Sequence, residues 1–167
     1  MFDRHKREAF TSLFMKNLTK TPIGIRPPYA KEASLFLSVC ATCNDAPCVR
    51  VCEEEIIVLG TDKTPSLLFT QSGCTFCKEC AHACPLDVLS LEAQEIIHAL
   101  FTIDTQGCIA WNGVVCCCCL DVCEPKAITF FGMFRPVVQR DVCTGCGLCY
   151  SVCPSNAVQY HSRNQGG

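Results

Sequence analysis

The chain has 167 residues, 18 of them cysteine, and a formal net charge of −2 at pH 7. A charged fraction of 18% excludes a disordered chain, no apolar run approaches the ~18 residues of a membrane span, and a pI near 6.1 argues against electrostatic binding to nucleic acid. Cysteine supplies much of the 49% apolar content, so we expect groups other than apolar side chains to help hold the fold.

The first region, residues 1–38, contains no cysteine and is predicted to be an N-terminal arm. It carries seven Lys or Arg residues against three Asp or Glu residues, so it is basic. Apolar side chains recur near helical spacing at Phe2, Phe10, Leu13, Phe14 and Leu18. This spacing predicts an amphipathic helix. Two interpretations stay open: the helix docks a partner protein, or it packs against the body of its own chain.

The basic start of the arm is followed by no uninterrupted apolar segment, because Lys16 and Lys20 divide it. A secretory signal would have such a segment, so we expect a cytoplasmic protein. In that compartment thiols stay reduced, and repeated Cys-x-x-Cys spacing indicates metal binding rather than disulfides.

Run one, the first group of cysteines, is Cys40-x2-Cys43-x4-Cys48-x3-Cys52. Its Cys-x3-Cys end matches the bacterial ferredoxin pattern. The middle interval is wider than the two residues of that pattern, and Glu53 stands where the pattern has proline. We expect these four cysteines to be ligands of [4Fe–4S] clusters in spite of the wider loop.

Run two is Cys74-x2-Cys77-x2-Cys80-x3-Cys84-Pro85, which is the bacterial ferredoxin spacing. Three thiolates at two-residue intervals wrap one cluster, whereas the fourth begins a helix and points toward the other cluster of a pair. Proline suits this place because its φ is already helical and its missing N–H is not needed there. Zinc, the alternative, prefers paired thiolates with longer gaps, which explains neither the third cysteine nor the Cys-Pro step.

Run three is less regular, because it has six cysteines, four of them consecutive at 116–119, which is more than the four of each other run. Counting back from Cys123 by the x3 and then the x2 interval selects Cys119 and Cys116. Cys108, across a seven-residue loop, is then the remaining candidate for the fourth ligand. The predicted ligands are Cys108, Cys116, Cys119 and Cys123. Cys117 and Cys118 are left over, either as small apolar or incidental thiols or for ligand exchange or redox chemistry. Whether this run holds a cluster stays open.

Run four, Cys143-x2-Cys146-x2-Cys149-x3-Cys153-Pro154, repeats the spacing of run two. Its four cysteines are therefore predicted to be cluster ligands as well. The sixteen predicted ligands of the four runs correspond to four [4Fe–4S] clusters, or to three if run three is empty.

The segment after each run also repeats, as a short helical turn and then a β-rich stretch such as Ile56–Leu59 or Ala127–Phe131. Four such units predict an α+β fold of tandem bacterial-type 2[4Fe–4S] ferredoxin-like modules, with short helices and short β-hairpins. We place module 1 at residues 39–95 and module 2 at residues 104–161. Pairing run one with run two and run three with run four is the simplest arrangement, and pairing one with four and two with three stays open.

Two segments beside the cysteines resemble a known family. Gly24-Ile25-Arg26-Pro27-Pro28 ahead of run one, and Cys123-Glu124-Pro125 at the end of run three, are similar to the NapF family of ferredoxin-type accessory proteins of periplasmic nitrate reductase systems. The likeness covers most of residues 22–160. The chain departs from the family in the x4 interval of run one and in having Lys6-Arg7 where paired arginines are common.

The resemblance implies a cytoplasmic, non-catalytic iron–sulfur protein that meets the precursor of the nitrate reductase catalytic subunit before export. The leading hypothesis is maturation of that subunit, by supplying or reducing its cluster. The alternative is an electron-relay subunit beside membrane quinol-oxidising subunits, and a third class is a structural zinc module. The sequence has no dinucleotide or phosphate-binding motif and no catalytic triad, so we expect neither enzymatic activity nor a nucleic-acid partner.

Overall fold

The computed structural model describes residues 24–163, so the amphipathic helix predicted in the arm lies outside the described residues. The elements are short and follow in the order α2 (Ala33–Ser38), η2 (Cys40–Thr42), α3 (Pro47–Arg50), β1 (Ile57–Leu59), β2 (Pro65–Leu67), α4 (Glu79–His82), β3 (Ala99–Ile103), α5 (Cys118–Asp121), β4 (Ile128–Phe131), β5 (Arg135–Val138), α6 (Leu148–Ser151) and β6 (Val158–Ser162). None of the helices in residues 24–163 combines the length and the apolar character that a membrane span needs.

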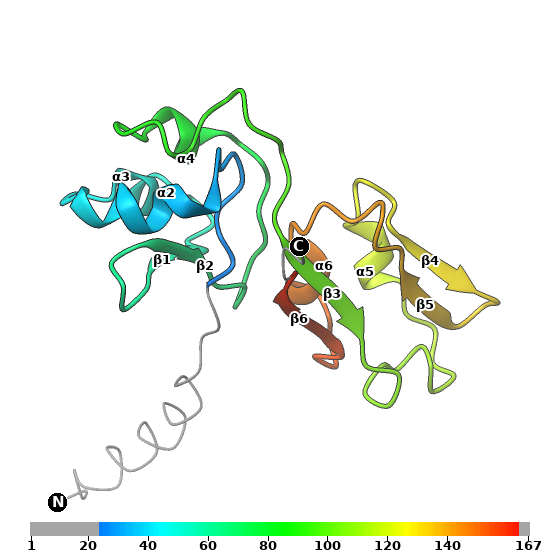
Figure 1. Cartoon of the computed structure of the whole chain (residues 1–167). Helices are drawn as coiled ribbons and strands as arrows, with labels where there is room; N and C mark the ends of the chain where they lie inside the picture. Colours follow the sequence, from blue (N-terminus) through cyan, green and yellow to red (C-terminus); the bar gives the residue numbers. More distant parts are fainter. Residues whose placement is uncertain (1–23, 164–167) are drawn as a thin grey trace, which may run out of the picture.

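The chain forms two lobes, an N-terminal lobe of residues 24–91 and a C-terminal lobe of residues 97–163 (Figure 1). The N-terminal lobe holds α2, α3 and α4 with the antiparallel hairpin of β1 and β2. The C-terminal lobe holds α5 and α6 with the antiparallel hairpin of β4 and β5. Short helices and short hairpins are the elements expected of a ferredoxin-like fold.

Each lobe also joins a segment before its first run to a segment after its second run. In the C-terminal lobe, β3 pairs with β6 antiparallel over five residues. In the N-terminal lobe, a single antiparallel bridge between Ala30 and Leu89 takes this place, beside a hydrogen bond from Ser90 N to Tyr29 O of 2.8 Å. Residues 24–38, assigned to the arm by the sequence-based division, therefore contribute to the packing of the N-terminal lobe.

A tight turn follows each of the four cysteine runs. Three residues beyond the last cysteine of each run, a non-glycine residue has φ between 52° and 55°, namely Glu55, Asp87, Lys126 and Asn156. The amide of each donates to the carbonyl of that cysteine at 3.0–3.4 Å. Positive φ is uncommon outside glycine, so its recurrence at one place marks a fourfold repeat. β1 and β4 begin after this turn, which confirms the predicted β-rich stretches after runs one and three.

The two lobes share one apolar core. Phe69 is fully buried and meets the rings of Phe101 and Tyr160 edge-on, with centroids 5.4 and 5.1 Å away. Nearby, the amide of Cys74 donates to the carbonyl of Cys146 at 2.7 Å. The core thus brings run two of one lobe against run four of the other.

Candidate metal centres

The sixteen cysteines predicted as ligands line four cavities. Site I has Cys40, Cys43, Cys48 and Cys84, site II has Cys52, Cys74, Cys77 and Cys80, site III has Cys108, Cys116, Cys119 and Cys153, and site IV has Cys123, Cys143, Cys146 and Cys149. The structure therefore groups run one with run two and run three with run four. In each pair, the last cysteine of one run lies at the site of the other.

The donor sets suit clusters rather than single ions. No three His, Cys, Asp or Glu side chains of residues 24–163 converge closely enough to hold one metal ion. Four thiolates bind four different irons of a [4Fe–4S] cluster, so they surround a body rather than a point. Four cysteines around each void fit that chemistry.

A four-residue helix carries the third predicted ligand of each run and ends before the fourth, so the expectation that the fourth cysteine begins a helix was wrong. The pairs are α3 with Cys48, α4 with Cys80, α5 with Cys119 and α6 with Cys149. A left-handed residue precedes three of these helices, with φ of 38° at Ala46, 71° at Lys78 and 83° at Gly147. Cys117 precedes α5 with φ of −126°. Run three therefore approaches its site with a different backbone.

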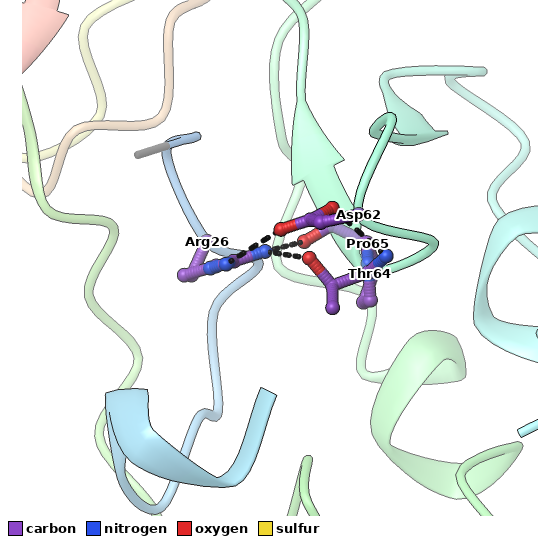
Figure 2. A network of polar contacts seen from close by, with 4 residues as sticks. All are labelled: Arg26, Asp62, Thr64 and Pro65. Carbon is purple, nitrogen blue, oxygen red and sulfur yellow. Dashed lines mark hydrogen bonds and ion pairs between the residues drawn. The ribbon is translucent and has the colours of Figure 1, made fainter. Parts of the chain in front are cut away.

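The turn before β2 forms one wall of site I, and Arg26 holds this turn in place (Figure 2). The Arg26 guanidinium donates to Thr64 Oγ1 and, at 2.9 Å, to Pro65 O, and it lies 3.5 Å from Asp62 Oδ2. The amide of Thr64 also donates to Asp62, at 3.0 Å. On its other side, Arg26 stacks over the ring of Phe36 at 4.8 Å. One partly buried cation thus ties the segment ahead of run one to the wall of the first site.

Tyr29 connects the same segment to site II. Its side chain is buried, and its hydroxyl donates to Phe76 O at 2.9 Å. Phe76 has φ of 53° and lies in the loop between the first two ligands of run two. Burial raises the pKa of Tyr29, so the hydroxyl keeps the proton that it donates. This hydrogen bond holds a ligand loop in its left-handed conformation.

Burial also raises the pKa of several thiols in the sites. It raises the pKa of Cys48 and Cys119 to about 11 and that of Cys74 and Cys80 to about 12. Before iron binds, these thiols are protonated at pH 7. Cluster assembly must therefore displace protons, as metal binding to thiols does in general.

Backbone amides approach the sulfurs of two last cysteines. Leu89 N lies 3.5 Å from Cys84 Sγ, and Ala157 N lies 3.3 Å from Cys153 Sγ, both as hydrogen-bond donors. These amides follow the repeated turn, so the turn both redirects the chain and brings a hydrogen-bond donor to a ligand sulfur. Hydrogen bonds to ligand sulfurs tune the reduction potential of a cluster.

The wide loop of run three is ordered by contacts within the loop and with segments outside the run. The amide of Cys108 donates to Asp104 O at 2.9 Å, and Asn112 Nδ2 donates to Cys108 O at 2.8 Å. Trp111 Nε1 donates to Pro136 O in β5 at 3.1 Å. These contacts bring the distal Cys108, buried, to site III with the three later cysteines of that site.

Three residues that shape the sites were missed by the sequence analysis. Arg26 belongs to a segment singled out only by its resemblance, Tyr29 directly follows that segment, and no pattern in the sequence says that the two residues reach two sites. Cys118, which was left over, lines the cavity of site III. The sequence did hold one signal for Cys118: it is two residues from Cys116, and residues two apart lie on the same side of an extended segment.

Comparison with known proteins agrees with this geometry. A family model described as a 4Fe–4S binding domain matches residues 136–159, which contain run four. The ferredoxin-type protein NapF of Escherichia coli K12 is 37% identical over 83% of this chain and 85% of its own length. NapF of Haemophilus influenzae is 34% identical over 92% and 88%, and the ferredoxin-type protein NapG of E. coli K12 is 31% identical over 78% and 66%.

The fold and the cysteine sites, together with these relatives, define an iron–sulfur protein of the ferredoxin type that binds [4Fe–4S] clusters. More specifically, the chain belongs to the NapF family. The resemblance noted in the sequence is thereby confirmed.

Proposed function

We propose that the chain carries four [4Fe–4S] clusters in two modules, with the sixteen cysteines of sites I–IV as their ligands. The observation that carries this proposal is the crossed arrangement, in which four cavities each receive three of the predicted ligands from one run and one from its partner. Anaerobic counts of iron and acid-labile sulfide test it: we expect about sixteen irons per chain. A count of about twelve irons or fewer, or zinc in their place, would reject it.

We further propose a non-enzymatic role in the cytoplasm, in maturation of the catalytic subunit of periplasmic nitrate reductase before export. Membership of the NapF family supports this role, because that family is named for the nitrate reductase system. In this proposal the clusters of the chain supply or reduce a cluster of the precursor.

An anaerobic affinity capture of the tagged chain from native cytosol tests the maturation role. We expect the signal-bearing precursor of the catalytic subunit to be recovered and the mature exported form to be absent. The chain with its clusters removed by a chelator is the matched control, since it shares the sequence but not the cofactors. Recovery of membrane quinol-oxidising subunits without the precursor would contradict maturation.

One observation favours the alternative, an electron relay. Crossed cysteines join site I to site II and site III to site IV, and the hydrogen bond from Cys74 N to Cys146 O, 2.7 Å long, joins sites II and IV. The sites therefore follow in the order I, II, IV, III through the molecule, as electron transfer between two partners requires. In a relay, every cluster stays bound through turnover. Loss of about four irons per chain on incubation with the apo-precursor would instead identify a cluster donor.

A further inference from the structure

Site III differs from the other three sites in its number of thiols. Its cavity is lined by five cysteines, because Cys118 joins Cys108, Cys116, Cys119 and Cys153. The cavities of sites I, II and IV are each lined by four. One cluster needs four ligands, so site III has one thiol more than a cluster uses.

The fifth thiol lies beside one particular ligand. Cys118 Sγ is 3.9 Å from Cys116 Sγ. Two neighbouring ligands of one tetrahedral metal at ~2.3 Å are about 3.8 Å apart, so the Cys118 sulfur lies no farther from the Cys116 sulfur than one coordination position and can replace it on the same iron by a short side-chain movement. Cys117, between them in sequence, turns elsewhere, and its Sγ lies 3.2 Å from Asp121 Oδ2.

The exchange would take place at an accessible edge of the site. Cys118 is exposed, Cys116 is half-buried, and Cys108 on the far side of the set is buried. Val114 and Val115, just ahead of Cys116, are 54% and 81% exposed. Cys108 therefore comes from a better-packed segment, whereas Cys116 follows exposed residues and lies where side chains have room to move.

We propose that Cys116 and Cys118 are interchangeable ligands of one iron of the site III cluster. In the exchange, the sulfur of Cys118 forms a bond to iron as the bond from Cys116 breaks, and the proton of the Cys118 thiol passes to Cys116. Iron, sulfide and electron counts of the cluster do not change. This inference rests on the proposed function only in requiring that site III be loaded.

Alanine variants reconstituted anaerobically test the exchange. We expect Cys116→Ala and Cys118→Ala each to keep about sixteen irons, and the double variant to keep about twelve. Cys146→Ala is the matched control in run four, where no spare thiol lines the site, and we expect about twelve irons. The double variant Cys116→Ala/Cys117→Ala should keep about sixteen, since Cys117 points away from the cavity.

Alkylation of the loaded wild-type chain gives a readout that needs no variant. We expect Cys116 and Cys118 each to be modified in part, with the two fractions summing to about one, and Cys117 to be modified fully, as measured by mass spectrometry of peptides. Full modification of Cys118 with full protection of Cys116 would overturn the exchange.

The outcomes separate this inference from the proposed function. A wild-type count of about sixteen irons with about twelve in Cys116→Ala rejects the exchange and leaves the four clusters intact. A wild-type count of about twelve that Cys108→Ala does not lower further shows that site III is empty, and it rejects both.

Discussion

The compact runs and the wide runs hold their ligands in different ways. In runs two and four the first three predicted ligands span seven residues, whereas they span nine in run one and twelve in run three. In run four, glycines at positive φ pack directly against neighbouring segments. In run one, Arg26 supports the turn that forms a wall of site I, and in run three Trp111 ties the wide loop to Pro136 O in β5. A cysteine run can therefore have a longer loop between its ligands where contacts with the rest of the fold hold the ligands in place.

The largest expected effect comes from Gly147→Ala in run four. Gly147 has φ of +83°, and an added Cβ would lie 2.4 Å from Phe69 Cδ1, in a ring that is fully buried. Left-handed strain and overpacking together should lower the free energy of unfolding by about 2 to 4 kcal/mol. Anaerobic thermal unfolding of the loaded protein measures this.

The matched control is Cys117→Ala, at the equivalent place before α5, where φ is −126°. We expect its melting midpoint to equal that of the wild type. Equal destabilisation by the two substitutions would show that runs three and four do not differ in backbone conformation at this position.

A smaller effect is expected for Arg26→Ala, which removes the support of site I. The substitution leaves Thr64, which is buried, without its guanidinium partner and deletes the hydrogen bond to Pro65 O. We expect a loss of about 2 to 3 kcal/mol of stability and selective loss of the site I cluster, measured as iron retained after gel filtration. The stability and iron content of Arg26→Lys should fall between those of the wild type and Arg26→Ala, because an ammonium group cannot reproduce the planar fork of donors of the guanidinium.

Unchanged iron content in Arg26→Ala, with the stability of the wild type, would mean that run one orders its own loop. The comparison between wide and compact runs would then rest on run three alone.

Trp111→Phe weakens the support of run three and should have a smaller effect. It keeps a ring beside Arg135, which lies 5.5 Å from the indole centroid, but removes the donor to Pro136 O. We expect a loss of about 1 kcal/mol and about fivefold faster release of four irons to a chelator, since each 1.4 kcal/mol is a factor of ten. The other irons are the internal control, and their faster release as well would show a general effect.

The sequence predicted the parts of this molecule that depend on local spacing. Spacing alone selected Cys119 and Cys116 by counting back from Cys123, and all three line sites in the structure. The β-rich stretches after runs one and three were also predicted from local composition.

Contacts between distant segments were not predicted, because no periodicity records them. The bridge between Ala30 and Leu89 joins residues 59 apart, so the boundary placed at residue 39 could not take it into account. Likewise the contact of Cys74 with Cys146 crosses between lobes. Cys117 and Cys118 are identical in type, and only the backbone turn separates one that faces Asp121 from one that lines site III.

The smallest effect is expected for Asp45→Asn in the wide loop of run one. Asp45 accepts two hydrogen bonds from Arg50, at 2.6 and 2.7 Å, and the pKa of Arg50 is raised by this hydrogen-bonded carboxylate. Both side chains are more than 60% exposed, and ion pairs at such sites are screened by water and salt.

We expect Asp45→Asn to leave the iron content and the melting midpoint of the wild type unchanged, at low and at high salt. A marked loss of the site I cluster at low salt that disappears at high salt would contradict this. It would show that a local ion pair, rather than Arg26 and the wall before β2, orders the extra residues of run one.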